Sequence, residues 1–241
     1  MSTAFNHYKN FLSKIYSWSS GDKSELFHKN AAWLMQQGIT EGTLLDLGAG
    51  FGSHAIPAAE IGLKVTAVDF SSELLVELKS FDTDSKIKIV ESDFVTFLRH
   101  HSEAYDYVLC LGDTLTHLDS IEIVKDLIQS LVDQVSENGK LILSWRDYQT
   151  TALTNENRFI LVRQDEKSLM TCVLEDKNNL QITVTDLYHQ KINGEFKVSG
   201  HSYPKIKLTP QTVSDLLHQA DFDVIKTTVT GRLIEMVATK N

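Results

Sequence analysis

The sequence predicts an α/β fold, in which a mostly parallel sheet carries helices on both of its faces. Between residues 43 and 146, short apolar runs alternate with segments of helical periodicity. The runs are apolar nearly throughout, as strands of a sheet covered on both sides must be. Strands and helices that alternate in this way form parallel strands joined by crossover helices.

Five strands are expected from these runs, at residues 43–47, 64–68, 86–90, 107–111 and 140–144. Helices are expected between them at residues 53–61, 72–80 and 120–135, and ahead of them at residues 24–37. Gly38 follows the segment at residues 24–37, at a position where glycine commonly ends a helix.

The pattern changes after residue 146. Four further runs read as strands joined by polar turns, at residues 158–163, 169–174, 180–188 and 195–199. With no helices between them, they predict an antiparallel meander. Thr209 and Pro210 then begin a helix as cap and first residue, and a hairpin follows at residues 222–229 and 232–239. We expect one domain over residues 1–241, with a helical lid at residues 1–40 and an antiparallel β cap inserted at residues 150–207.

The composition of the chain limits the classes of molecule that it is expected to bind. The chain has 241 residues, with 23 Lys and Arg against 32 Asp and Glu, for a net charge of −9. Proteins that bind nucleic acid usually present a basic face, so a small-molecule substrate is favoured. No stretch approaches the ~18 apolar residues that span a bilayer, and the two cysteines form no disulfide framework. The nine histidines show no metal-like spacing, so we expect a cytoplasmic protein without a metal, nucleic-acid partner or membrane partner.

A glycine-rich turn follows the first predicted strand. It reads Asp46-Leu47-Gly48-Ala49-Gly50-Phe51-Gly52. Glycine allows a sharp backbone turn and a close approach of the backbone to a ligand. Dinucleotide-binding turns read Gly-x-Gly-x-x-Gly, but here Ser53 stands at the sixth position and the third glycine comes one residue earlier. This spacing argues against a pyrophosphate ligand.

Two acidic residues follow the next two predicted strands. Asp69 precedes Phe70 at the end of the second strand, and Asp93 precedes Phe94 after the third. A carboxylate at the end of the second strand can accept hydrogen bonds from ribose hydroxyls. Each acid is also placed to cap the helix that follows it.

Together with the fourth predicted strand, these features resemble the motifs of class I S-adenosylmethionine-dependent methyltransferases. The resemblance covers about residues 44–148, extends more loosely to the C-terminal hairpin, and implies a Rossmann-like sheet of seven strands. It implies that Asp46 meets the amino group of S-adenosylmethionine, Asp69 the ribose and Asp93 the adenine. The cofactor-binding residues that it implies here are Asp46, Gly48, Ala49, Gly50, Gly52, Asp69, Phe70, Asp93, Phe94 and Leu111.

Two segments after the fourth and fifth predicted strands resemble the glycine/sarcosine N-methyltransferases. Residues 112–118 read Gly-Asp-Thr-Leu-Thr-His-Leu, and residues 146–148 read Arg-Asp-Tyr. The resemblance implies catalytic or acceptor-positioning roles for His117 and Arg146. Arg146 would offer a fork to an acceptor carboxylate, unless Asp147 occupies its guanidinium. His117 would act as a general base or positioning group, or else serve as a structural histidine.

Residues 15–22 are similar to the lid segments of the same methyltransferases. They contain Tyr16 and Trp18. An aromatic face near the sulfonium would gain ~0.5–2 kcal/mol of cation–π stabilisation. The resemblance therefore implies a catalytic role for Tyr16 and a cofactor contact for Trp18, whereas in another context both would be ordinary packing aromatics.

The sequence thus predicts S-adenosylmethionine-dependent methyl transfer to a small molecule, either an amine or an amino or carboxylic acid. Two alternatives stand beside it. One is an NAD-dependent oxidoreductase on a related sheet, and the other is a non-catalytic protein that binds S-adenosylmethionine or S-adenosylhomocysteine. The sequence leaves the acceptor, the methylated atom and the oligomeric state open, with a homodimer as one option.

Overall fold

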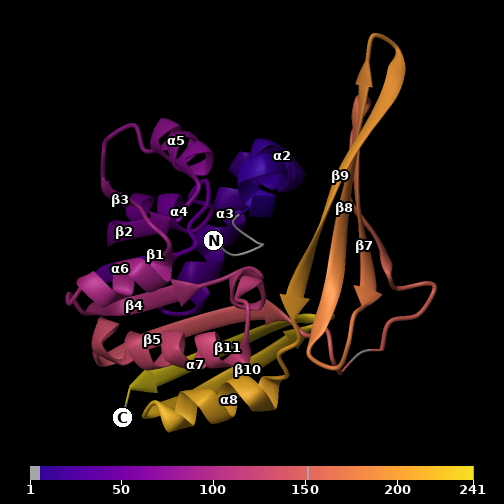
Figure 1. The fold of residues 1–241 in the computed structure, drawn as a ribbon. Helices are drawn as coiled ribbons and strands as arrows, with labels where there is room; N and C mark the ends of the chain where they lie inside the picture. Colours follow the sequence, from indigo (N-terminus) through magenta and orange to yellow (C-terminus); the bar gives the residue numbers. More distant parts are fainter. Residues whose placement is uncertain (1–5, 151, 241) are drawn as a thin grey trace.

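The computed structural model describes residues 6–150 and 152–240. The first five residues of the predicted lid and residue 151 of the predicted cap lie outside the described residues, as does residue 241. Two sheets organise the described chain (Figure 1). The larger consists of β1 (Thr43–Leu47), β2 (Lys64–Asp69), β3 (Ile87–Glu91), β4 (Tyr105–Cys110), β5 (Val135–Arg146), β10 (Phe222–Thr230) and β11 (Leu233–Lys240).

This seven-stranded sheet has the order β10-β11-β5-β4-β1-β2-β3. Strands β1 to β5 pair in parallel, and β11 pairs antiparallel with both β5 and β10. The carboxyl ends of β1 and β4 therefore lie side by side at the centre of the sheet. The predicted α/β class and the mostly parallel sheet of seven strands are confirmed.

Six helices cover the two faces of the sheet. They are α3 (Lys23–Gln36), α4 (Ala55–Glu60), α5 (Ser72–Phe81), α6 (Phe94–His100), α7 (Ile121–Leu131) and α8 (Pro210–Gln219). One apolar cluster joins α6, α7 and α8 to one face, and a second joins α3, α4 and α5 to the other. Neighbouring strand residues divide between these clusters, since Leu44 belongs to one and Leu45 to the other. None of the helices in the described ranges is long and apolar enough to cross a membrane.

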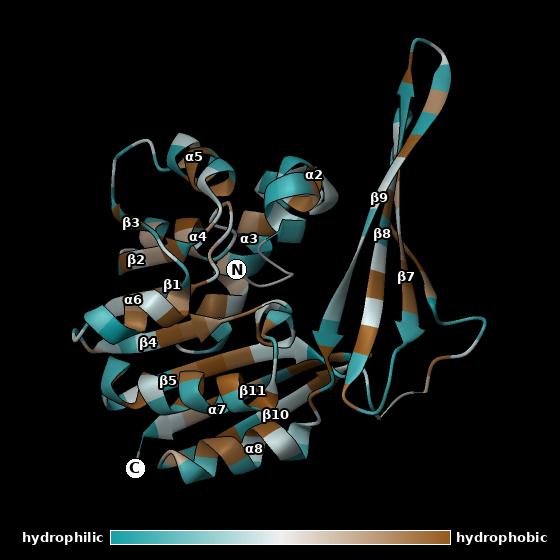
Figure 2. Cartoon of the chain, in the orientation of Figure 1, coloured by the Kyte–Doolittle hydropathy of each residue, from teal (hydrophilic) through white to brown (hydrophobic). Residues whose placement is uncertain are grey.

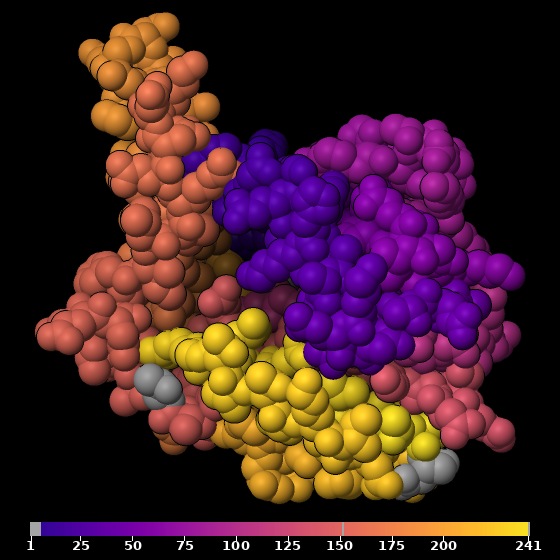
Figure 3. Space-filling view, turned by 180° about the vertical axis from the view of Figure 1, so that it is seen from behind, coloured from indigo at the N-terminus to yellow at the C-terminus, as the bar shows by residue number. Residues whose placement is uncertain are grey.

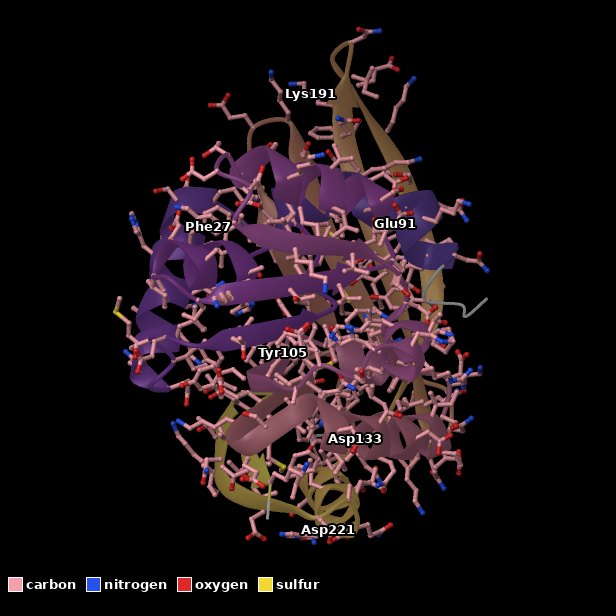
Figure 4. All side chains as sticks on the ribbon, turned by 90° about the vertical axis from the view of Figure 1, so that its left-hand side faces the viewer. Phe27, Glu91, Tyr105, Asp133, Lys191 and Asp221 are labelled. Atoms are coloured by element: carbon pink, nitrogen blue, oxygen red, sulfur yellow. The ribbon has the colours of Figure 1, made fainter. Side chains whose placement is uncertain are left out.

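A four-stranded antiparallel sheet leaves the main sheet after β5 and returns before α8. It consists of β6 (Phe159–Gln164), β7 (Ser168–Asp176), β8 (Gln181–Ile192) and β9 (Glu195–Ile206), and we call it the cap. Figure 2 shows hydrophobic and hydrophilic colours alternating along β8, as expected for a strand with two different faces. The hairpin of β8 and β9 projects from the body, with Lys191 near its outer tip (Figure 4).

Several strands are longer than the sequence predicted, above all β5, β8 and β9. β5 begins at Val135 rather than residue 140, and the β8–β9 hairpin extends well beyond residues 188 and 199. The polar stretch at Glu137 and Asn138 reads as a turn, and Asn138 indeed has a φ of 64°. The last residues of β8 are exposed and mostly polar, and residues 200–206 of β9 contain Gly200 and Pro204, which are uncommon inside strands, so neither part shows a clear strand pattern in the sequence.

The N-terminal segment, residues 6–20, contains a π-helical turn (Tyr8–Leu12) and α2 (Ser13–Ser19). Figure 3 shows this segment lying between the cap and the helices at the other side of the molecule. It therefore borders both the main sheet and the cap.

Gly52 has a packing role within this fold. Its φ is +86°, and an added Cβ would lie 2.8 Å from Cγ of Leu78 on α5. We expect Gly52→Ala to lower the free energy of unfolding by about 1–3 kcal/mol, because it adds both backbone strain and overpacking. Gly62→Ala is the matched control, since Gly62 has a φ of +105° and open space around it. Urea denaturation of both variants tests this, and equal losses would contradict a packing role for Gly52.

Candidate active site

A single large cavity lies at the carboxyl ends of the parallel strands, between the main sheet, the N-terminal segment and the cap. Its volume is about 1480 Å³, which exceeds the roughly 300–1,000 Å³ of a typical pocket for one small ligand. Most of the predicted site residues line it, namely Tyr16, Asp46, Gly48, Ala49, Gly50, Asp69, Phe70, Asp93, Phe94, Leu111, His117 and Arg146. The cavity has room for two small molecules side by side.

The glycine turn forms one end of this cavity, which we call the donor end. Gly48 and Gly50 have φ angles of +77° and +56°, in the region that favours glycine. The N–H of Gly48 donates to the Val68 carbonyl at 2.9 Å, and the N–H of Gly50 donates to Oδ2 of Asp69 at 2.8 Å. These bonds hold the turn against the end of β2 and leave its backbone facing the cavity.

Asp46 presents an unsatisfied carboxylate oxygen at the donor end. The residue is buried, and its Oδ2 accepts no hydrogen bond from any described residue. Burial raises the pKa of Asp46 to about 7, and the neighbouring Asp69 adds to the shift. A buried carboxylate oxygen without a donor is costly, so this position suits a ligand that carries a positive charge.

Asp69 and Asp93 each accept hydrogen bonds from the backbone and also line the cavity. Asp69 accepts from the N–H groups of Gly50 and Ser71, both at 2.8 Å, while Ser71 itself caps α5. Asp93 caps α6 by accepting from the N–H of Thr96 at 2.9 Å. Because a carboxylate has about four acceptor positions, these bonds leave both acids able to accept from a ligand in the cavity that they line.

Two of the predicted cofactor contacts do not line the cavity. Gly52 packs against α5, and Trp18 faces the cap, where its Nε1 donates to Asp165 at 2.8 Å. The Trp18 ring also makes an edge contact with Tyr188, at 5.4 Å between ring centroids. The aromatic residues of the N-terminal segment that line the cavity are Tyr16 and Tyr8, and the sequence reasoning missed Tyr8.

Asp113 organises the other end of the cavity, which we call the acceptor end. It accepts from Tyr148 Oη at 2.6 Å and from the N–H of Arg146 at 2.9 Å, and it forms an ion pair with Lys205 of the cap. Burial alone would raise the pKa of Asp113, but the charge of Lys205 and the hydrogen bonds with Lys205 and Tyr148 lower it. Sequence reasoning missed Lys205, because the contact joins residues 92 positions apart.

Arg146 keeps its guanidinium available. The ion pair with Asp147 that the sequence allowed does not form, because Asp147 accepts from the N–H groups of Gln149 and Thr150 instead. The Nε of Arg146 lies 3.9 Å from Oδ2 of Asp113, and its side chain is 52% exposed. Lys205 is already bound to Asp113, so the guanidinium of Arg146 is the cationic group in this lining that remains exposed to a ligand.

His117 lies between Asp113 and the N-terminal segment. Its ring is parallel to that of Tyr203, at 5.5 Å and 11°, and meets the Tyr8 ring edge-on at 5.5 Å. Burial lowers the pKa of His117 well below its ordinary value, and Lys205 lowers it further. The imidazole is therefore neutral near pH 7, and its buried Nδ1 accepts no hydrogen bond from the described residues. A base this weak suits the positioning of a neutral amine better than the removal of a proton from an ammonium group.

No three His, Cys, Asp or Glu side chains gather as metal ligands would within residues 6–150 and 152–240. The cavity lining supplies carboxylates, cationic side chains and aromatic rings. A cavity with an acidic donor end and an exposed guanidinium at the acceptor end can hold two different molecules in contact.

Known proteins resemble this chain in sequence and in fold. Residues 44–139 match the methyltransferase domain family. Two solved structures share the fold over nearly the whole chain: the CcbJ methyltransferase from Streptomyces caelestis (TM-score 0.77, 16% identity, 92% of this chain and 98% of that one) and the S-adenosylmethionine-bound amino pentose methyltransferase CalS10 from Micromonospora echinaspora (0.74, 13%, 95% and 96%). The family match covers about 40% of the chain, and the two solved structures show that the fold is shared over nearly all of it.

Among curated proteins, the chain is similar to the glycine/sarcosine N-methyltransferases. It is 33% identical to that of Aphanothece halophytica over 157 residues, which cover 59% of this chain and 57% of the relative. It is 29% identical to that of Halorhodospira halochloris over 140 residues, which cover 56% and 50%. The chain thus spans a little more than half the length of the first of these relatives and half the length of the second.

Proposed function

We propose that the protein transfers the methyl group of S-adenosylmethionine to the nitrogen of a small amine that also carries an acidic group. The observation that carries this proposal is one continuous cavity, which joins the unpaired Oδ2 of Asp46 to the exposed guanidinium of Arg146. The similarity to glycine/sarcosine N-methyltransferases supports an amino acid as the acceptor class.

The donor end fits S-adenosylmethionine. Asp46 would pair with its ammonium group, Asp69 would accept from its ribose hydroxyls, and Asp93 with Phe94 would hold its adenine. The bound cofactor supplies a methyl group that its positive sulfur has already activated. The protein has only to hold the acceptor nitrogen close to that methyl group and exclude water.

The acceptor end supplies this positioning. The exposed guanidinium of Arg146 would bind the acceptor's carboxylate through two parallel hydrogen bonds. The neutral ring of His117 would accept from the N–H of the amine and orient its lone pair. Because the amine is methylated in its neutral form, no strong catalytic base is required.

An assay of S-adenosylhomocysteine release tests the proposal. We expect turnover with at least one acceptor among glycine, sarcosine, dimethylglycine, larger amino acids and amino sugars. Saturable binding of S-adenosylmethionine without turnover on this panel would favour a non-catalytic binding protein. Saturable binding of NADH, followed by nicotinamide fluorescence, would favour the oxidoreductase. We expect none, because Asp46 beside the glycine turn would repel a pyrophosphate.

Cofactor affinity is expected to depend on the protonation of Asp46. Its pKa of about 7 means that the carboxyl group is mostly neutral at pH 5.5 and mostly charged at pH 7.5. Because the charged form binds the ammonium group, the Kd for S-adenosylmethionine should rise roughly 20-fold from pH 7.5 to pH 5.5. Calorimetric titration checks this, with adenosine, which lacks the ammonium group, as a pH-independent control. Equal Kd values at both pH values, or an unchanged pH dependence in Asp46→Asn, would contradict the pairing.

Arg146→Met is expected to raise the KM for the acceptor by roughly 10–100-fold, because it removes a charge-assisted double hydrogen bond. The Kd for S-adenosylmethionine should stay within about threefold of the wild-type value. Arg158→Met is the matched control, since Arg158 pairs with Glu175 on the cap, away from the cavity lining. Steady-state kinetics on the best acceptor measure both variants. An unchanged acceptor KM in Arg146→Met would remove the carboxylate-binding role.

A further inference from the structure

His7 is fully buried, although it is a polar residue in the N-terminal segment. Its Nε2 lies 3.1 Å from Oδ2 of Asp186 on β8, and its Nδ1 lies 3.0 Å from Nδ1 of His201 on β9. Its ring stacks on Tyr203, at 3.8 Å between centroids and an interplanar angle of 21°. All three partners belong to the cap, so His7 joins the N-terminal segment to that sheet.

The hydrogen bonds of His7 are consistent with a neutral ring. Burial lowers the pKa of His7, and the interaction with Asp186 opposes that shift only in part. In a neutral imidazole one nitrogen donates and the other accepts. Nε2–H therefore donates to Asp186, which leaves Nδ1 to accept from the ring of His201. Loss of His7 would leave the buried carboxylate of Asp186 without this donor.

The residue next to His7 lies between the two ends of the cavity. The ring of Tyr8 contacts Phe70 at the donor end and His117 at the acceptor end, both at 5.5 Å between centroids. It also lies 5.9 Å from the ring of Tyr16. Tyr16 in turn lies over the glycine turn, since a Cβ on Gly50 would come 3.6 Å from its Cε1.

We propose that His7 is a positioning residue, whose buried contacts with Asp186 and Tyr203 hold the N-terminal segment across the cavity. Tyr8 and Tyr16 then form a wall that the donor and acceptor ends share. Asp186 on the cap thereby acts on the donor end through His7, although it lies on the other sheet. The proposal rests on the proposed function only in assuming that the donor end binds S-adenosylmethionine.

Hydrogen–deuterium exchange and calorimetry on three variants test this role. His7→Phe keeps a ring that can stack on Tyr203 but removes both ring nitrogens, and Asp186→Leu removes their partner. Asp186→Asn is the conservative variant, because its amide oxygen still accepts from Nε2–H of His7. His28→Phe is the matched control, since His28 is exposed on α3.

In His7→Phe and Asp186→Leu, we expect the amides of residues 8–19 to exchange roughly tenfold faster, because the segment opens more often. The Kd for S-adenosylmethionine should rise by about tenfold, because the wall of the donor end is no longer held in place. Exchange in β1 and β4 should stay at the wild-type rate. Asp186→Asn should restore both quantities to near the values of His28→Phe, and the double variant His7→Phe/Asp186→Leu should be no worse than either single variant.

Wild-type exchange in residues 8–19 together with wild-type affinity for S-adenosylmethionine, in both His7→Phe and Asp186→Leu, would overturn the proposal. Exchange that rises equally in the segment and in β1 would also overturn it, because that result indicates a general loss of stability. A wild-type protein that binds S-adenosylmethionine but methylates no amine would count against the proposed function, whereas the exchange and affinity of the variants would still decide the role of His7.

Discussion

Gly50→Arg is expected to abolish the binding of S-adenosylmethionine. Gly50 has a φ of +56°, and a Cβ there would lie 3.6 Å from Tyr16 and 3.8 Å from Leu74. A longer side chain at this position has no room except in the donor end of the cavity. We expect the Kd to rise by at least about 100-fold, because arginine fills the volume that the cofactor needs and adds a cation beside its binding position.

Gly62→Arg is the control for Gly50→Arg. Gly62 also has a positive φ, of +105°, but nothing lies within 4 Å of an added Cβ. The two variants therefore share the backbone strain and the added charge, and differ in the space that the side chain enters. Calorimetric titration of both variants with S-adenosylmethionine measures the two Kd values. Wild-type affinity in a folded Gly50→Arg protein would show that the cofactor does not lie against the glycine turn.

Asp113→Ala is expected to cause the second large effect, because it leaves the buried ammonium group of Lys205 without its partner. The side chain of Lys205 is only 7% exposed, and breaking a buried ion pair in this way costs about 3–5 kcal/mol of stability. The same change also removes the acceptor for Tyr148 and for the backbone N–H of Arg146. We expect kcat/KM for the acceptor to fall by about 100-fold or more, since small displacements of positioning groups have effects of this size.

The double variant Asp113→Ala/Lys205→Met separates these two consequences. Removing the unpaired cation should recover more than about half of the lost free energy of unfolding. Activity should stay low, because Arg146 and Tyr148 remain unanchored. Denaturant unfolding and acceptor kinetics on the single and double variants measure both effects. A double variant as unstable as Asp113→Ala, or one with restored activity, would contradict this account of the acceptor end.

The fold could be predicted where local pattern determines it. The buried parallel strands are apolar on both faces, so β1 matches its predicted residues 43–47, and the capping side chain of Thr209 marks the start of α8. The last residues of β8 were missed because they are exposed and mostly polar, and residues 200–206 of β9 were missed because Gly200 and Pro204 interrupt the strand pattern. The first residues of β5 were missed for a similar reason, since a glycine and an asparagine there resemble a turn.

The candidate site also has a part that could be predicted from the sequence and a part that could not. The donor end depends on residues close in sequence to the ends of β1, β2 and β3, so the motif spacing indicated Asp46, Gly50 and Asp69. The acceptor end depends on long-range contacts, such as that of Asp113 with Lys205, 92 residues away. Trp18 shows the same limit, because its aromatic character predicted a ligand contact but packing against Tyr188 directs it to the cap.

The central claim is that the glycine turn, Asp46 and Asp69 together bind S-adenosylmethionine. Calorimetric titration of the wild-type chain with S-adenosylmethionine, and separately with NADH, tests it most directly. We predict saturable binding of S-adenosylmethionine at one site per chain and no binding of NADH. Binding of NADH in preference to S-adenosylmethionine, or no binding of S-adenosylmethionine by the folded protein, would contradict the claim.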